Sequence, residues 1–209
     1  MSKPLPTSVR THFTALRALL VLTVILGVVY PLVVTGISQV AFGDKANGSI
    51  VTSDGKEVGS SLLGQNFNLP KANPDDPKEE AKPDPKWFQP RPAANGYAGD
   101  NSGASNLGPN SEDLLKAVND RRAAVAEFDG VDPATVPADA LTASGSSLDP
   151  DISPAYAKEQ VDRVARERKL PVEKVAGLVD KYTESRPLGF LGNEVVNVVL
   201  LNKALSEKK

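Results

Sequence analysis

The feature that most constrains this chain is an uncharged, apolar stretch close to its N-terminus. Residues 18–43 contain no Asp, Glu, Lys or Arg. A helix needs about 20 apolar residues to cross the hydrocarbon core of a bilayer, so this stretch is long enough to span with room for tilt. A cleaved signal peptide has a shorter apolar region and a small-x-small cleavage site. The run ends without an A-x-A pattern, and only Gly36-Ile37-Ser38 leaves cleavage open as an alternative. We predict a retained single-span anchor.

The charges beside the stretch predict its orientation. Lys3, Arg10 and Arg17 precede it, and residues 1–17 contain no acidic residue. Short flanks rich in Lys and Arg remain on the cytoplasmic side of a membrane. The chain is therefore expected to have a cytoplasmic flank at 1–17, a transmembrane helix at 18–43 and one extracytoplasmic domain at 44–209.

The apolar stretch also has a pattern that favours packing against other helices. Pro31 removes a hydrogen bond from the helix and predicts an irregularity there. Small or weakly polar residues at intervals of three or four, the spacing of Gly27, Pro31, Thr35 and Ser38, share one face, as in helices that associate within membranes. A lone anchor needs no such face. The candidate residues for packing on a partner helix are Gly27, Tyr30, Pro31, Thr35, Gly36 and Gln39.

Composition excludes several functions for residues 44–209. This part holds all 26 acidic residues and 21 of the 24 basic ones, so its net charge of −5 argues against nucleic acid as a partner. The chain has no cysteine, and its one histidine is His12 on the cytoplasmic flank. A Ser-His-Asp triad, a thiolate metal site and a histidine metal ligand are therefore excluded outside the membrane. No catalytic residue and no metal ligand is predicted, although a Ser–Lys hydrolase or a carboxylate pair stays formally open.

The pattern of elements after the anchor predicts an α+β domain. Short apolar runs on either side of Ser53-Asp54-Gly55 indicate a β-hairpin. Helices are expected to begin at Ser111, at Ser153 and at Pro171. The apolar run at 195–202 fits a strand by its β-branched residues and a helix by its length, and periodicity leaves both open.

Two segments between these elements lack regular patterns. Residues 68–86 form an acidic, Pro-rich stretch without apolar periodicity or EF-hand spacing, and are predicted to be a disordered loop rather than a calcium site. The aromatic pair Trp87-Phe88 stands before Arg91 and between prolines, and reads as a rigid extended anchor in the core or an interface.

A Gly/Ser-rich loop at 142–150 is the strongest apparent chemical motif. It does not match G-x-S-x-G, and it lacks the lysine of a phosphate-binding loop. It would either hold an anion through backbone N–H groups or serve only to lead Ser153 into its cap. Asp149 and Asp151 beside the cap favour the structural alternative. The amides of Asn106, Asn197 and Asn202 are expected to satisfy backbone groups.

Many short motifs, taken in order, resemble one family. They are Tyr30-Pro31 with Thr35-Gly36 and Gln39, Ala46-Asn-Gly-Ser49, Gly59-Ser60, Gly64-Gln65, Phe88-x-x-Arg91-Pro92, Gly103-x-Ser-Asn-Leu-Gly-Pro109, Leu141-Thr-Ala-Ser-Gly145, Leu148-Asp-Pro150, Ile152-Ser-Pro154, Gln160-Val with Arg163-Val-Ala165, and Val196-Asn-Val198 with Leu201-Asn202. This series is similar to the C chain of the Kdp potassium-transporting ATPase, the KdpC family. The insertion at 68–86 and the residues Ala104 and Ser147 depart from that pattern.

The resemblance implies an accessory subunit of a complex in the bacterial plasma membrane that imports K⁺ with ATP. Its implied partners are a channel-like potassium-translocating subunit and a P-type ATPase subunit. The family's C chain is needed for assembly and is described as a catalytic chaperone that raises the ATP affinity of the ATPase subunit. Since ATP is cytoplasmic and the charges place the Gly/Ser loops outside, no tightly bound cofactor is predicted, and ATP is expected only in a transient complex with the ATPase subunit.

The same resemblance marks loop residues that are expected to support the fold, contact another subunit or weakly touch nucleotide. They are Asn47, Gly48, Ser49, Gln65, Arg91, Ser105, Asn106, Ser144, Gly145, Ser146, Asp149 and Pro150. Two other classes of function stay open. A membrane-tethered Ser/Lys hydrolase would use Ser144 or Ser146 with a lysine, and a stand-alone extracytoplasmic binding module would fold and bind its ligand without partners.

Overall fold

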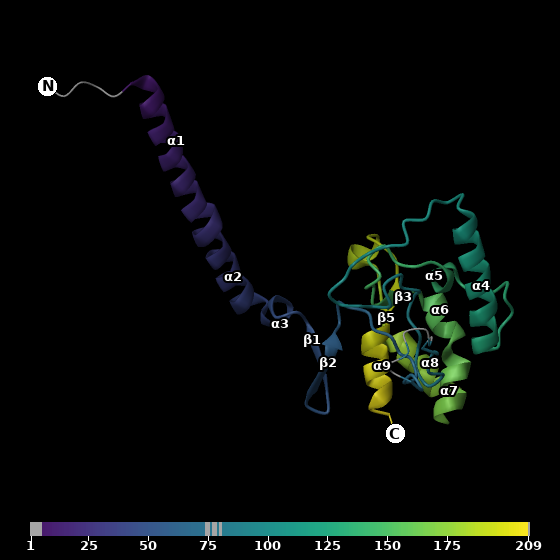
Figure 1. The fold of residues 1–209 in the computed structure, drawn as a ribbon. Helices are drawn as coiled ribbons and strands as arrows, with labels where there is room; N and C mark the ends of the chain where they lie inside the picture. Colours follow the sequence, from purple (N-terminus) through teal and green to yellow (C-terminus); the bar gives the residue numbers. More distant parts are fainter. Residues whose placement is uncertain (1–5, 74–75, 77–78, 80, 209) are drawn as a thin grey trace. The chain divides into compact units, whose positions relative to one another are not determined.

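The computed structural model describes residues 6–73, 76, 79 and 81–208. The chain consists of two compact units, residues 1–49 and residues 50–209 (Figure 1). The first unit is helical and the second is an α+β domain, as the sequence predicts.

The first unit is one long apolar helix with a short extension. It consists of α1 (Thr7–Val24), a π-helical turn η1 (Ile25–Val29), α2 (Tyr30–Ala41) and α3 (Gly43–Ala46). The 35-residue helix from Thr7 to Ala41 is long and apolar enough to cross a membrane, and the residues of its most apolar part are not buried in the structure. The helix begins at Thr7 rather than at Ala18. The irregularity expected from Pro31 takes the form of the widened turn η1, because the helix must accommodate a residue without an N–H group.

The second unit contains five strands and six α-helices among its described residues. The strands are β1 (Ile50–Ser53), β2 (Lys56–Ser60), β3 (Asp151–Ile152), β4 (Thr183–Glu184) and β5 (Val195–Asn197). The helices are α4 (Glu112–Asp129), α5 (Ala138–Leu141), α6 (Pro154–Glu159), α7 (Val161–Arg168), α8 (Val172–Lys181) and α9 (Val198–Ser206), with a short 3₁₀ turn η2 (Pro187–Gly189).

The predicted β-hairpin is confirmed. Strands β1 and β2 are antiparallel, with Ser53 opposite Lys56 and a register shift between Val51 and Thr52. Asp54 (φ 50°) and Gly55 (φ 76°) both adopt the left-handed conformation. Two successive residues of this kind form the tight turn whose twist matches that of the strands.

The C-terminal run resolves into a strand and a helix, so both alternatives at 195–202 hold in part. Strand β5 is the middle strand of an antiparallel sheet ordered β3-β5-β4. The side chain of Asn197 then accepts a hydrogen bond from Leu200 N (3.1 Å) and caps α9. The β-branched pair Val195 and Val196 fills the sheet, and the cap at Asn197 starts the helix.

Two predicted helix starts are confirmed by their capping bonds. Ser111 Oγ accepts from Leu114 N at 3.4 Å, and Ser153 Oγ accepts from Tyr156 N at 3.0 Å. Pro171 is the N-cap of α8. The helix expected from Ser153 is in fact two, α6 and α7, which meet at the fully buried Gln160.

The core of the domain lies where α6–α9 pack on the sheet (Figure 1). Phe88 is fully buried there, which confirms the sequence-based interpretation of the aromatic pair as an anchor. The segment around Phe88 belongs to no helix or strand, yet its peptide groups are buried. Such groups cost free energy unless they find hydrogen-bond partners.

Two amide side chains supply those partners. Asn202 accepts from Phe88 N (3.0 Å) and donates to Phe88 O (2.9 Å). Gln160 accepts from Gln89 N (2.6 Å) and donates to Gln89 O (3.1 Å). Each amide therefore takes the place of a neighbouring strand for one residue of the extended chain. We call this arrangement of Phe88, Gln89, Asn202 and Gln160 the amide clamp.

A buried arginine completes the clamp from the other side. The Arg163 side chain is 1% exposed; its Nε donates to Asp129 Oδ1 (2.6 Å), and its Nη2 donates to Gln160 Oε1 (2.6 Å). Its Nη1 donates to the carbonyls of Pro85 (2.6 Å) and Trp87 (2.9 Å). A buried charge is tolerated only when it is paired and hydrogen-bonded in this way.

The described residues of the acidic segment pair at its two ends. Leu69 N donates to Lys82 O (2.8 Å), and Asp84 N donates to Phe67 O (3.0 Å). The side chain of Glu79 accepts from the backbone of Ala72 and Asn73. Disorder over 68–86 stays a prediction, and residues 74–75, 77–78 and 80 lie outside the described residues.

Replacing Asn202 with leucine tests the amide clamp. Asn202→Leu keeps the side-chain volume but leaves the buried N–H and C=O of Phe88 without partners, which predicts a loss of about 2–4 kcal/mol in the free energy of unfolding. Fluorescence of Trp87, the one tryptophan of the chain, measures this in denaturant titrations of the full chain in detergent. Asn119→Leu on the exposed face of α4 is the control, expected within about 0.5 kcal/mol of the parent. Equal stability of the two variants would contradict the clamp.

Candidate functional site

The candidate packing residues lie on the long helix of the first unit. Gly27 is within the π-helical turn, and Pro31 and Thr35 follow on α2. A Cβ built at Gly36 would meet nothing within 4 Å, and the Tyr30 side chain is exposed. At 3.6 residues per turn, Pro31, Thr35 and Ser38 share one face, whereas Gly36 lies well round the helix from it. Whether this face packs on a partner stays a prediction.

The end of the helix is tied by a pair of amides. Gln39 Nε2 donates to Asn47 Oδ1 (3.1 Å), and Asn47 Nδ2 donates back to Gln39 Oε1 (3.2 Å) and to Gly43 O (2.8 Å). Gly48 (φ 91°) and Ser49 (φ 50°) then adopt the left-handed conformation, which turns the chain after α3. The motif at 46–49 thus shapes the exit from the helix.

A group of contacts around Arg91, which we call the Arg91 cluster, joins the segment after the amide clamp to the loop before β3. Arg91 Nη1 pairs with Asp149 Oδ2 at 2.9 Å, and Arg91 Nη2 donates to Thr142 O at 3.3 Å. The Tyr97 hydroxyl donates to Arg91 O at 2.8 Å. Gly64 packs so closely here that an added Cβ would lie 2.7 Å from Asp149 O. The structure therefore brings together residues distant in the sequence.

The Gly/Ser-rich loop uses its hydroxyl groups on the protein itself. Ser147 Oγ donates to Gly103 O (2.6 Å) and accepts from Ala94 N (2.8 Å). Ser146 Oγ accepts from Leu148 N at 3.1 Å and lies 3.5 Å from Ser144 Oγ. The hydrogen bonds of these serines in the described structure involve no lysine. This arrangement favours the structural interpretation of the loop.

The remaining candidate residues do not converge on one site. Gln65 Nε2 donates to Val58 O (2.7 Å) and so supports the hairpin. Ser105 and Asn106 lie in an exposed segment, with Asn106 in the left-handed conformation (φ 53°). Gly145 lies in the Gly/Ser-rich loop, and Pro150 O accepts from Val198 N at 2.9 Å. The predicted residues thus divide between the helix exit, the hairpin, the Arg91 cluster, the Gly/Ser-rich loop and the exposed segment at 105–106.

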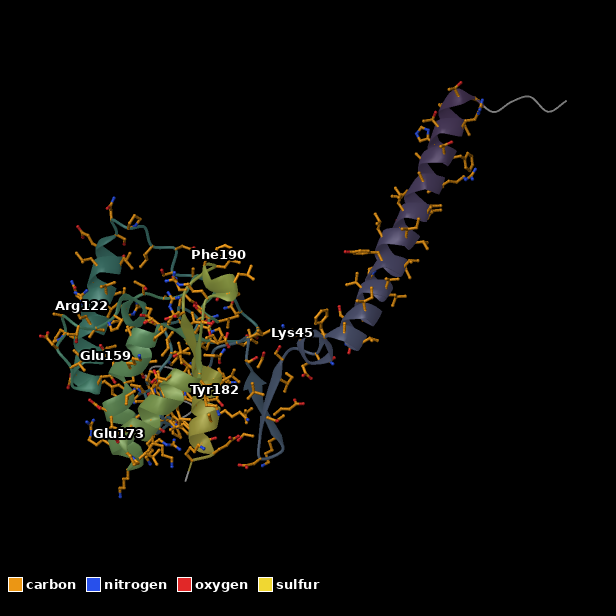
Figure 2. The ribbon with its side chains drawn as sticks, turned by 180° about the vertical axis from the view of Figure 1, so that it is seen from behind. Lys45, Arg122, Glu159, Glu173, Tyr182 and Phe190 are labelled. Atoms are coloured by element: carbon orange, nitrogen blue, oxygen red, sulfur yellow. The ribbon has the colours of Figure 1, made fainter. Side chains whose placement is uncertain are left out.

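Burial raises the pKa of Asp129 and Glu159, two carboxylic acids in the domain. Burial raises the pKa of Asp129, and the ion pair with Arg163 opposes that rise. Burial, with the charges of Asp129 and Asp139, raises the pKa of Glu159 to about 7. Glu159 is on α6 (Figure 2), and its buried Oε1 has no hydrogen-bond partner among the described residues. Within that part of the chain, no three His, Cys, Asp or Glu side chains are grouped to hold a metal ion.

Sequence reasoning missed an exposed apolar loop between β4 and β5. Leu188 and Phe190 are 81% and 71% exposed, and Leu188 has a left-handed backbone (φ 55°). The side chain of Phe190 is labelled in Figure 2. Leu188 and Phe190 are the two most exposed large apolar side chains of the described domain apart from the membrane helix. The glycines and the proline around them gave the only sequence signal, which indicates a loop and not its exposure.

Comparison with known proteins gives the same family over nearly the whole chain. The model of the family "KdpC: K+-transporting ATPase, c chain" matches residues 12–207. The chain belongs to the KdpC family. It is therefore a subunit of a K⁺-transporting ATPase complex, and the resemblance inferred from its motifs is confirmed.

Three relatives named "Potassium-transporting ATPase KdpC subunit" are similar along their full length. The Streptomyces coelicolor protein is 49% identical over 221 residues, covering 99% of this chain and 96% of the relative. The Kineococcus radiotolerans protein is 50% identical over 207 residues, covering 98% and 97%. The Mycobacterium tuberculosis protein is 45% identical over 199 residues, covering 94% and 97%. The similarity to these relatives thus covers both the long helix and the α+β domain of this chain.

The environment of Glu159 predicts a pH dependence of stability. Its pKa in the folded chain is about 7, above the ordinary value of 4.5, so the folded state binds a proton more tightly than the unfolded state. The favourable contribution is complete below 4.5 and is lost as the pH rises through 7. Glu159→Gln cannot ionise and so avoids this loss. The free energy of unfolding of the variant, minus that of the parent, should therefore increase as the pH rises from 4.5 to 7. Denaturant midpoints of the full chain measure it.

Glu127→Gln is the matched control for that experiment. Glu127 is exposed on α4, so its variant should follow the parent at every pH. If Glu159→Gln and the parent lose stability in parallel between pH 4.5 and 7, ionisation of the buried Glu159 does not cause the loss of stability, and the prediction is wrong.

Proposed function

We propose that this KdpC chain is a non-catalytic accessory subunit that is needed to assemble an ATP-driven potassium import complex and raises the ATP affinity and turnover of its P-type ATPase subunit. The observation that carries the proposal is the 35-residue apolar helix, none of whose described side chains is buried. In a member of this family, a helix with one face of small residues is well suited to pack on the membrane helices of another subunit.

The proposed orientation places the N-terminus in the cytoplasm and residues 44–209 outside the bacterial plasma membrane. Lys3, Arg10 and Arg17 on the N-terminal side support it, because basic flanks stay inside. The small-residue face of the helix would then pack on the channel-like potassium-translocating subunit. The α+β domain would cover the outer mouth of that subunit, with the exposed loop at Leu188 and Phe190 as an apolar contact.

Energetic coupling explains how such a subunit acts on ATP hydrolysis without touching the nucleotide. If the domain docks more tightly on the conformation of the pump that also binds ATP more tightly, it stabilises that conformation and raises the apparent ATP affinity. ATP binding then strengthens docking by the same factor. A tenfold effect requires a difference of at least about 1.4 kcal/mol in docking free energy between the two states. Ser144, Ser146 and Asp149 support this role indirectly, because they hold the loop that carries β3. Any contact with ATP would be transient and would involve the ATPase subunit.

Hydrolysis by the chain itself has less support. Ser144 is buried, and Ser146 Oγ accepts a backbone N–H. The contacts of the two serines within the described structure include neither a histidine nor a lysine to activate a hydroxyl. No observation favours a stand-alone binding module over a subunit that packs on its partners.

The test is purification of the tagged full chain from its native membrane, followed by an assay of K⁺-stimulated ATPase activity. The parent should recover a channel-like subunit and a P-type ATPase, and activity should fall when the chain is omitted. Thr35→Leu adds bulk to the small-residue face and should reduce recovery at least tenfold, because helix backbones can no longer approach closely.

Val33→Leu is the control, since it adds similar bulk on the opposite side of α2 and keeps the helix apolar. It should recover the complex like the parent. Equal recovery with Thr35→Leu would reject the assigned face. A chain that purifies alone, beside an ATPase that works without it, would reject the accessory function altogether.

A further inference from the structure

A groove in the α+β domain has the chemistry of an anion site. Its volume is about 240 Å³, and it lies between the segment 90–97 and α4, with Ala140 of α5 and Tyr156 of α6 in its walls. Two arginines, Arg91 and Arg121, are among the residues that line it. Prolines and alanines form much of the rest of its lining.

Both arginines are held in place while part of their donor capacity remains. Arg91 uses Nη1 on Asp149 and Nη2 on Thr142 O, but its buried Nε has no hydrogen-bond partner in the described structure. Arg121 is fixed by one bond, from Nη1 to Leu141 O at 2.9 Å. It forms no ion pair with a described residue. A guanidinium has five donors in a planar fork that matches a carboxylate.

The charges around the groove leave one positive charge uncompensated. Asp149 neutralises Arg91, and nothing described neutralises Arg121. Burial raises the pKa of Tyr97 above its ordinary value, so its phenol stays a neutral donor rather than an opposing anion. Asp139, which lies beside Ala140 in the sequence, directs both carboxylate oxygens to Ser153. The groove thus suits a ligand with a single negative charge.

We propose that this groove binds a carboxylate, with its oxygens taken by the guanidinium of Arg121, which lies beside Arg91 in the lining of the groove. Two sources offer the same chemistry, a small free carboxylate and an acidic side chain of another subunit. The site is distinct from the exposed loop at Leu188 and from the helix face, and it does not depend on the proposed coupling to ATP.

Acetate is the probe, added to the full chain in detergent micelles while ¹H–¹⁵N spectra follow the arginine Nε signals. Saturable shifts of Arg91 and Arg121 are expected at millimolar acetate, and chloride at equal ionic strength should not reproduce them. Arg121→Gln should weaken the acetate response of Arg91 at least tenfold. Arg121→Lys keeps the charge but loses the fork, and should weaken it by less.

Arg122→Gln is the matched control. Arg122 is the next residue of α4 (Figure 2), bonds to Asn119 (3.3 Å) and does not line the groove. This variant should respond to acetate like the parent, and unchanged backbone spectra confirm that each variant is folded. A response that is absent, that chloride reproduces or that survives in Arg121→Gln overturns the proposal.

The assembled complex distinguishes the two sources of carboxylate. If the Arg121 signal of the complex still shifts with acetate, the site is open to a free anion. If that signal in the complex already matches the acetate-saturated chain and no longer responds, a carboxylate of another subunit fills the groove. Either result supports the site, and a complex whose Arg121 signal matches the acetate-free chain and does not respond contradicts it.

Discussion

The α+β domain depends on how it buries an extended segment that belongs to no sheet. Phe88 fills the core, so the peptide groups on either side of it leave water and need partners. The side-chain amides of Asn202 and Gln160 supply these partners. Arg163 donates to the carbonyls of Pro85 and Trp87, which precede Phe88 in the chain. Helices α6, α7 and α9 are thereby tied to a segment far away in the sequence. The strands of the three-stranded sheet are short, and these side chains satisfy backbone groups that would be paired with a neighbouring strand in a larger sheet.

Local signals predicted most of the elements, and long-range contacts limited the rest. Capping serines, the Asp54-Gly55 turn and the uncharged stretch each act over a few residues, so the sequence reveals them. The break between α6 and α7 at Gln160 was missed, because that amide turns inward to bind Gln89 and no local pattern records it. The Leu188 loop was missed for a similar reason, since periodicity cannot separate an exposed apolar loop from a buried run.

The motif residues of the candidate site have two roles. On the long helix they leave a face of small side chains uncovered, and the family places the chain in a K⁺-transporting ATPase complex. In the domain, Arg91 and the serines of the Gly/Ser-rich loop bind neighbouring backbone and Asp149. Sequence motifs identified these residues and could not show what they contact.

Hydrogen exchange of the Phe88 and Gln89 amides tests the central claim most directly. Both N–H groups donate to side chains, at 3.0 Å and 2.6 Å, rather than to a strand. If the clamp holds the domain together, these amides should exchange only through global unfolding, as slowly as the slowest amides of α8. Exchange as fast as that of the exposed residues 105–108 would show that the segment opens on its own, and would contradict the account.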